Sequence, residues 1–117
     1  MIDDGLLPHL VEVESPGSRT DPYGNTLPDW TASARAPVRG WMQQESAAED
    51  TDQRNAQIST WLLICNPWTT TGDPLTVHGR DRVHWGARRF EVTGPPGPEY
   101  EPGGLHHYEI QLREVHG

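Results

Sequence analysis

Glycine and proline interrupt this sequence so often that a long helix has little room to form. The two residue types fill 23 of the 117 positions, 12 Gly and 11 Pro, which is about twice their average share. Only 33 % of the residues are hydrophobic, and several short stretches alternate apolar with polar residues, the period of a strand with one buried face. We therefore predict a single all-β domain over residues 1–117, a small β-barrel or sandwich of five to six strands with long loops.

The alternating stretches predict strands at 8–14, 36–44, 57–65 and 106–115, and a hairpin over 80–93. The strand at 57–65 is apolar on both faces. One face carries Trp61, Leu63 and Cys65, and the other carries Leu62 and Ile64. A strand of this kind sits centrally in a sheet or is covered outside by a neighbour.

In the predicted hairpin, Gly86 and Ala87 form the turn, and Phe90 and Val92 point inward. The run at 94–98, Gly-Pro-Pro-Gly-Pro, follows the hairpin. We expect it to end the strand pairing, because its three prolines lack a backbone donor.

Three further segments are predicted to lie outside the strands: an N-terminal arm at 1–7 and long loops at 15–35 and 45–56. Pairs of turn-forming residues break up 15–35, while Tyr23 and Trp30 supply apolar anchors, so we expect an excursion pinned to the surface. Residues 45–56 are almost wholly polar. We expect a solvated loop there, because such a composition buries too little surface to offset the entropy lost on ordering.

The charge balance argues against one class of function. Seventeen Asp and Glu stand against nine basic residues, all of them Arg, for a formal net charge of −8. A protein that grips nucleic acid needs clustered positive charge. The balance leaves open a protein through which nucleic acid passes. The longest apolar run, 61–65, is too short to span a membrane, so no membrane partner is predicted.

No set of residues points to catalysis, a cofactor or a metal ion, and we predict that the protein is not an enzyme. The single cysteine, Cys65, excludes an internal disulfide and favours a reducing compartment; its place in an apolar strand indicates a small buried side chain. The six histidines lack metal-ligand spacing, and the adjacent His106 and His107 would point to opposite faces of a strand. Neither a nucleophile motif nor a phosphate-binding loop occurs.

Five tryptophans allow three interpretations: stacking on bases, packing in a thin core, or filling a subunit interface. Stacking on bases is the least favoured, because no basic residues are interleaved with them. The five are Trp30, Trp41, Trp61, Trp68 and Trp85.

Several motifs occur in an order that resembles a known family. The clearest are DRVHWG at 81–86, then RFEVTGPP at 89–96, and the closing strand HYEIQLR at 107–113. Weaker similarity covers DPYGN at 21–25, PDW at 28–30 and VRG at 38–40. Over roughly residues 8–115 the sequence resembles the head–tail connector proteins of tailed bacteriophages, known as stopper, head-closure or head–tail adaptor proteins.

The resemblance implies a small β-barrel with a long loop, assembled into a ring of six or twelve subunits in the virion neck. Such a ring docks below the portal and its adaptor ring once DNA packaging in the bacterial cytoplasm ends. It stops leakage of the genome, offers a docking surface to a tail terminator or tail tube, and opens for ejection. Double-stranded DNA passes through it without specific contacts, and no cofactor is implied.

With that role in view, we expect two sets of functional residues. The segment 45–56 is the candidate channel-gating loop, through Glu45, Glu49, Asp50, Asp52 and Arg54. Candidate contacts to a neighbouring subunit or ring are Tyr23, Trp30, Arg39, Arg82, Arg88 and Arg89. The competing interpretation of these arginines is an ordinary solvated surface, where exposed ion pairs contribute little.

Two other functions remain open from the residues alone. One is a different ring of the same neck, such as a tail terminator. The other is a monomeric β-domain that binds a peptide or carbohydrate through exposed tryptophans.

Overall fold

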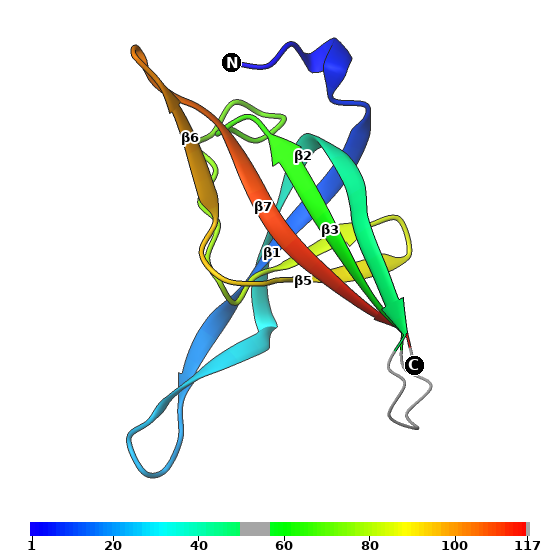
Figure 1. The fold of residues 1–117 in the computed structure, drawn as a ribbon. Helices are drawn as coiled ribbons and strands as arrows, with labels where there is room; N and C mark the ends of the chain where they lie inside the picture. The colour runs from blue at the N-terminus through cyan, green and yellow to red at the C-terminus, as the bar shows by residue number, and fades with distance from the viewer. Residues whose placement is uncertain (50–56, 117) are drawn as a thin grey trace.

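The computed structural model describes residues 1–49 and 57–116, and most of them lie in strands (Figure 1). A short 3-10 turn, η1 (Asp4–Leu6), precedes seven strands. The strands are β1 (His9–Thr20), β2 (Thr26–Glu49), β3 (Gln57–Cys65), β4 (Arg82–Trp85), β5 (Arg88–Val92), β6 (Gly97–Glu101) and β7 (Gly104–His116). The predicted all-β class is confirmed, with one strand more than expected. No helix in the described part of the chain is long and apolar enough to cross a membrane.

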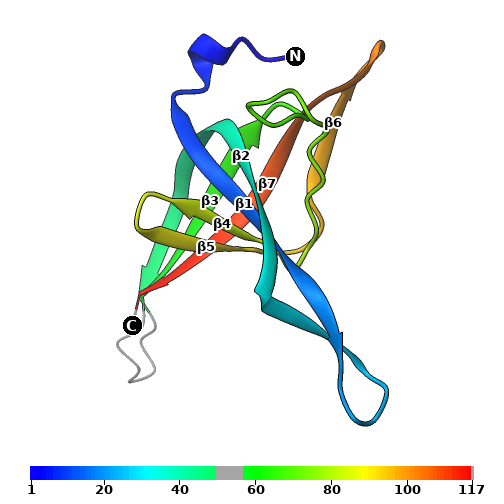
Figure 2. The same ribbon diagram turned by 180° about the vertical axis from the view of Figure 1, so that it is seen from behind.

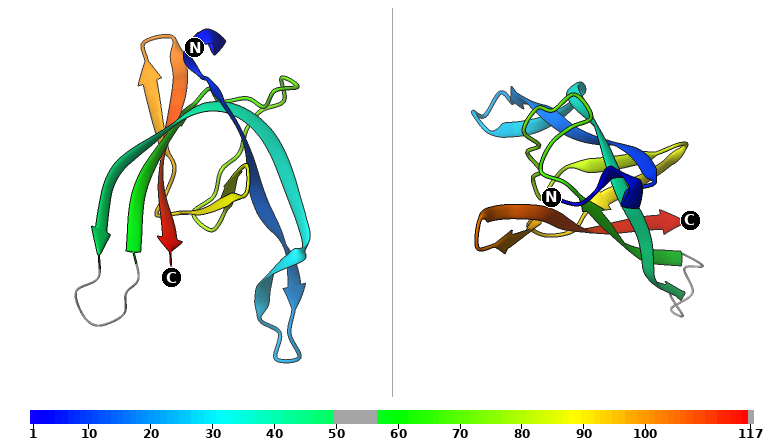
Figure 3. Two further views of the ribbon diagram at one scale, coloured as in Figure 1. Left: turned by 90° about the vertical axis from the view of Figure 1, so that its right-hand side faces the viewer. Right: turned by 90° about the horizontal axis from the view of Figure 1, so that it is seen from above.

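The strands form one antiparallel sheet that closes on itself. Its order is β3-β2-β1-β4-β5-β7-β6, and a further pairing of β3 with β7 completes a ring of six strands. The ring is not a regular barrel, because β5 meets β7 at only two residue pairs, Glu91 with Arg113 and Val92 with Leu112. Long β2 belongs to two walls: it pairs first with β1 and then arches over to pair with β3 (Figure 3, left).

The core fills the inside of this ring with alternate residues of each strand. Val11, Val13, Val38, Leu63, Val83, Phe90, Ile110 and Leu112 are all 2 % exposed or less. Phe90 and Val92 point inward as predicted, and so do Trp61, Leu63 and Cys65 of the doubly apolar strand. Burial raises the pKa of the Cys65 thiol to about 12, which makes it the inert buried side chain that its position indicated.

The segment 15–35 is not a loop, and that prediction is wrong. β1 and β2 continue past the barrel as a two-stranded arm, closed by a tight turn at 21–25 in which the Asp21 carboxylate accepts the backbone N–H groups of Tyr23 and Asn25. Prolines are tolerated in the arm because each of its strands has a free edge, where a missing donor is not needed. The turn-forming residues thus mark the ends and bends of strands.

The arm bends away from the barrel at one bulge, visible as a corner in β2 (Figure 1). Ser15 pairs with Ala34 but Gly17 pairs with Asp29, so residues 30–33 stand opposite Pro16 alone. The bend brings the Ala32 carbonyl oxygen to within 2.6 Å of where a Cβ on Gly17 would lie. Only glycine fits this close approach without a shift in the backbone.

β6 was not predicted, because the prolines of 94–98 were expected to end the pairing. The strand begins at Gly97 and pairs with β7 only, so it lies at an edge of the sheet. Pro98 can occupy that edge because no neighbour needs its missing N–H. The Gly97 backbone also approaches β7 closely: a Cβ there would lie 2.8 Å from the Glu109 carbonyl oxygen.

The N-terminal residues are tied to the barrel. The buried Asn66 side chain accepts from the Ile2 N–H at 2.7 Å and donates to the Ile2 carbonyl at 2.8 Å, and Leu7 is 1 % exposed. The predicted arm at 1–7 therefore packs back on the loop that follows β3.

Candidate assembly surfaces

Different elements extend from the two ends of the barrel. One end carries η1 and the turn between β6 and β7, at the top of Figures 1 and 2. From the opposite end, the arm and the β2–β3–β7 wall extend in the same direction like two legs (Figure 3, left).

The β2–β3–β7 leg includes the first part of the acidic segment 45–56. β2 pairs with β3 as far as Glu49 with Gln57, so 45–49 belong to a strand and the loop prediction is wrong for them. Glu45 is exposed on this strand. Glu49 is its last residue. Asp50, Asp52 and Arg54 lie outside the described residues, and the gating role of the segment stays a prediction.

A polar cluster fixes the base of the arm. It consists of Glu14, Ser33, Arg35 and His84, and we call it the arm-base cluster. Glu14 is only 6 % exposed. Its carboxylate accepts from Ser33 Oγ at 2.5 Å, contacts His84 Nε2 at 2.6 Å and lies 3.8 Å from Arg35 Nε. The Ser33 hydrogen bond, with His84 and Arg35, holds the pKa of Glu14 below its ordinary value despite burial.

Two predicted interface residues meet next to this cluster. The Arg82 guanidinium of β4 stacks over the Trp30 ring, 3.6 Å from its centroid. Since Trp30 belongs to the bulge, this cation–π contact holds the arm against β4. Both side chains thus have a partner within their own subunit, and a role at a subunit contact stays a prediction.

Arg88 is also engaged inside the subunit. Its Nε and Nη2 donate to the two carboxylate oxygens of Glu114 at 2.9 and 2.5 Å, and its guanidinium lies 4.7 Å from the Trp61 ring centroid. Glu114 is 5 % exposed, whereas the Arg88 side chain is 42 % exposed, so the pair lies at the boundary between the core and water. The bond raises the pKa of Arg88, and the pair links β5 with β7 where their backbone pairing is short.

The other three predicted contact residues are open to solvent. Tyr23 lies at the tip of the arm and is 89 % exposed. Arg39 and Arg89 are exposed on the barrel, and neither makes an ion pair with another described residue. These residues are free to meet a partner.

Asp81, the first residue of the resemblance motif, holds the turn before β4. It is 2 % exposed, and its Oδ2 accepts the His78 N–H at 2.8 Å. Its backbone carbonyl accepts from Val92 N at 3.0 Å. The motif therefore begins at a buried residue that holds the turn before β4 and ties it to the end of β5.

The tryptophans divide between the core and the surface. Trp61 is buried, and Trp85 packs against it and against His9. Among the described tryptophans only Trp41, 46 % exposed, ranks as an exposed side chain. A binding face made of several exposed tryptophans is thus absent from 1–49 and 57–116. Over the same ranges, no group of three or more His, Cys, Asp or Glu is arranged to hold a metal ion.

A comparison with known protein families identifies the family to which this chain belongs. The model of the phage head completion protein family matches residues 2–114. The chain belongs to this family. As a phage head completion protein it is a structural component of a phage or phage-like virion, in agreement with the resemblance of its motifs.

Structural comparison gives the same fold. A chain from a solved structure, described as "Virion of native gene transfer agent (GTA) particle", is similar to this head completion protein with a TM-score of 0.69 and 20 % sequence identity. The similarity covers 94 % of this chain and 96 % of that one. Among curated proteins, no sequence matches it significantly.

Sequence reasoning missed Glu14 and Glu114, the buried acids of the two ion-pair sites. Glu114 could have been suspected, because it continues the inward period of Ile110 and Leu112. Glu14 carries no such signal: the bulge at Pro16 brings Ser33 and Arg35 over it.

Proposed function

We propose that this head completion protein forms a ring in the head–tail neck that closes the DNA exit channel after packaging. The ring docks under the portal and its adaptor, receives the tail terminator or tail tube, and opens for ejection. The observation that carries the proposal is the long β2–β3 ladder, which extends one wall of the barrel and includes 45–49 of the acidic segment up to its last pair, Glu49 with Gln57. A segment at the end of a rigid ladder can reach toward an axis that the barrel itself does not touch.

The distribution of charge supports a channel that DNA passes through without sticking. Six copies at −8 each give −48, and twelve give −96. Several arginines are already engaged with their own subunit, as Arg88 is with Glu114, Arg113 with Glu91, and Arg82 with Trp30. They are therefore poorly placed to bind phosphate. Salt screens such fields over about 10 Å, so only acidic groups close to the duplex repel it.

The test shortens the gating segment. Replacing 50–56 by a two-residue turn should leave the barrel folded, because β2 and β3 remain paired up to Glu49 and Gln57. Particles carrying this variant should lose packaged DNA, measured as the fraction of DNase-protected genomes relative to wild type. We expect a loss of at least tenfold.

A matched control replaces Asp50, Asp52 and Arg54 by Asn, Asn and Gln at full length, which separates the length of the segment from its charge. Full genome retention in the shortened particles would contradict the gating role of 45–56. If the protein copurified with free tails and not with filled heads, it would be a tail-side ring such as a terminator.

A further inference from the structure

The outer face of β3 is apolar and only partly covered by the described part of its own chain, since Leu62 and Ile64 are half-buried there. Leu62 and Ile64 point away from the core on this strand, and Ile64 pairs across to Trp41 of β2. Leu10 of β1 follows on the same side and is 57 % exposed. We call Leu10, Arg39, Trp41, Leu62 and Ile64 the apolar flank. Leu10 and Trp41 are its exposed apolar side chains, and apolar side chains that gather on a surface mark interaction sites.

Arg39 gives this flank a chemical preference. It pairs in register with Leu10, is exposed, and makes no ion pair with any residue of 1–49 or 57–116. It also lines a pocket of about 220 Å³ together with Asn66, Trp68 and Thr70. Asp4 lies on the same pocket without reaching salt-bridge distance of Arg39. A guanidinium between an apolar flank and a polar pocket suits a partner that offers a carboxylate beside an apolar ring.

A surface of this kind, with carboxylates beside an apolar ring, lies on β6 of the same chain. Among the described residues this strand pairs with β7 only, so its other edge has no strand partner there, and it exposes Glu99, Tyr100 and Glu101. Tyr100 is 72 % exposed. Neither glutamate makes an ion pair with another described residue. We call these three residues the acidic edge. Natural proteins seldom leave such an edge unprotected.

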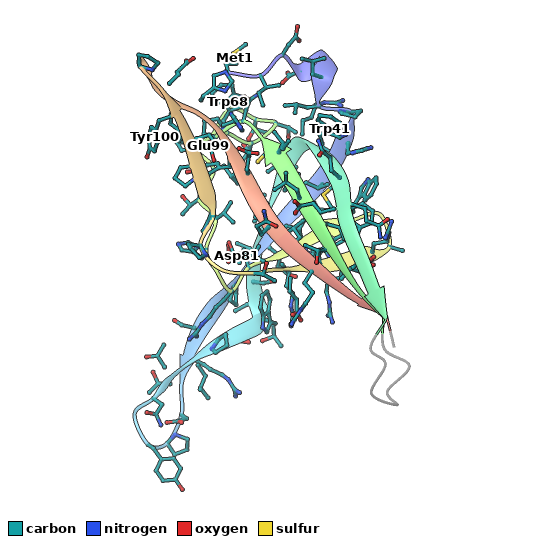
Figure 4. The ribbon with its side chains drawn as sticks, viewed as in Figure 1. Met1, Trp41, Trp68, Asp81, Glu99 and Tyr100 are labelled. Atoms are coloured by element: carbon teal, nitrogen blue, oxygen red, sulfur yellow. The ribbon has the colours of Figure 1, made fainter. Side chains whose placement is uncertain are left out.

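The two surfaces lie on opposite sides of one subunit at the same level. Figure 4 shows Glu99 and Tyr100 at the upper left and Trp41 at the upper right. They therefore cannot meet within a subunit. Two different patches on opposite sides make a head-to-tail contact, which closes into a ring when the rotation between subunits allows it.

We propose that the acidic edge of one subunit docks on the apolar flank of the next copy of this chain. Tyr100 packs against Leu10 and Trp41, and Glu99 or Glu101 pairs with Arg39. The inference deepens the proposed function, since it rests on a ring and names the surfaces that build it.

Cysteine crosslinking in assembled particles tests the pairing directly. Leu10→Cys and Tyr100→Cys change exposed side chains, and buried Cys65 does not compete for the reagent because burial holds its thiol protonated. With a short bismaleimide, the double variant should give a ladder of covalent oligomers that ends at the ring size. Each single variant should stay monomeric, and a mixture of the two single variants should give dimers only.

Charge reversal supplies the second readout. Arg39→Glu alone, and Glu99→Arg with Glu101→Arg, should each reduce incorporation into particles at least tenfold, and combining all three should restore it. Arg19→Glu is the matched control, an exposed arginine of the arm that lies outside the flank and the acidic edge, and it should incorporate as wild type does.

The failures of the two proposals are distinguishable. Dimers from Leu10→Cys alone, or no ladder although the protein is present in the necks of filled particles, would overturn the pairing and leave the neck function intact. Absence of the protein from the neck would overturn both.

Discussion

β1 and β2 run through two regions of the molecule, the barrel and the arm, and are stabilised differently in each. In the barrel, alternate residues of the pair, such as Val11, Val13 and Val38, are buried almost completely. In the arm the same two strands expose most of their side chains, from Ser18 to Thr26. A lone two-stranded hairpin is marginally stable in water. The arm therefore depends on its base, where the bulge, the Trp30–Arg82 contact and the arm-base cluster hold it to β4.

The largest effect should come from the core of the barrel. Phe90→Ala removes a fully buried ring that packs edge-on against Trp61 at 5.4 Å, and should lower the free energy of unfolding by about 3–5 kcal/mol. Tyr23→Ala at the arm tip is the control and should change it by less than about 0.5 kcal/mol. Urea unfolding followed by tryptophan fluorescence measures both. If the two variants lost similar free energies of unfolding, the barrel core and the arm tip would not differ in stability as their burial predicts.

A smaller effect should follow from Gly17→Ala at the bend. The new Cβ would meet the Ala32 carbonyl oxygen at 2.6 Å, so the bulge must shift. This shift should lower the free energy of unfolding by about 2 kcal/mol. The neighbouring exposed Ser18→Ala should be near neutral. Hydrogen exchange should show the arm amides losing protection while those of β3 and β7 keep it. Unchanged protection in the arm would mean that the bend does not fix its position.

The smallest of the three effects, about 1 kcal/mol at neutral pH, should come from Glu14→Gln in the arm-base cluster. Folding lowers the pKa of Glu14 from its ordinary 4.5, so its carboxylate stabilises the fold above about pH 4.5. That contribution is lost as the pH falls through the lower folded-state pKa. Stability of the wild type should thus drop more steeply below pH 4.5 than that of Glu14→Gln. If the free energies of unfolding of the wild type and of Glu14→Gln fell in parallel below pH 4.5, with His84 and Arg35 unchanged in both, the stabilising role of the Glu14 carboxylate would be contradicted.

The elements that sequence predicted well are those with a local signal, either a continuous apolar run or two alternating stretches around a short turn. The doubly apolar strand at 57–65 coincides with β3, and the hairpin with its Gly86-Ala87 turn coincides with β4 and β5. Both depend on local period and turn chemistry, which neighbouring residues specify. The arm and β6 were missed because proline and glycine signal interruption equally in a loop and at a free strand edge.

The candidate site was less accessible to sequence reasoning, because ion pairs depend on register between distant strands. Arg88 could be proposed as a subunit contact, yet its partner, Glu114, lies 26 residues away on β7. Tyr23 was also expected to anchor the segment 15–35 by apolar contact; this is wrong, because at the tip of the arm its side chain is 89 % exposed. The roles of Asp50, Asp52 and Arg54 stay predictions from composition and family.

A reconstruction of the neck of filled particles by electron cryo-microscopy tests the central claim most directly. The account predicts a closed ring of this chain between the portal complex and the tail, with residues 45–56 crossing the channel and β6 of each subunit against β1 and β2 of the next. Density for the chain outside the neck, or a ring whose channel is closed by another protein, would contradict it.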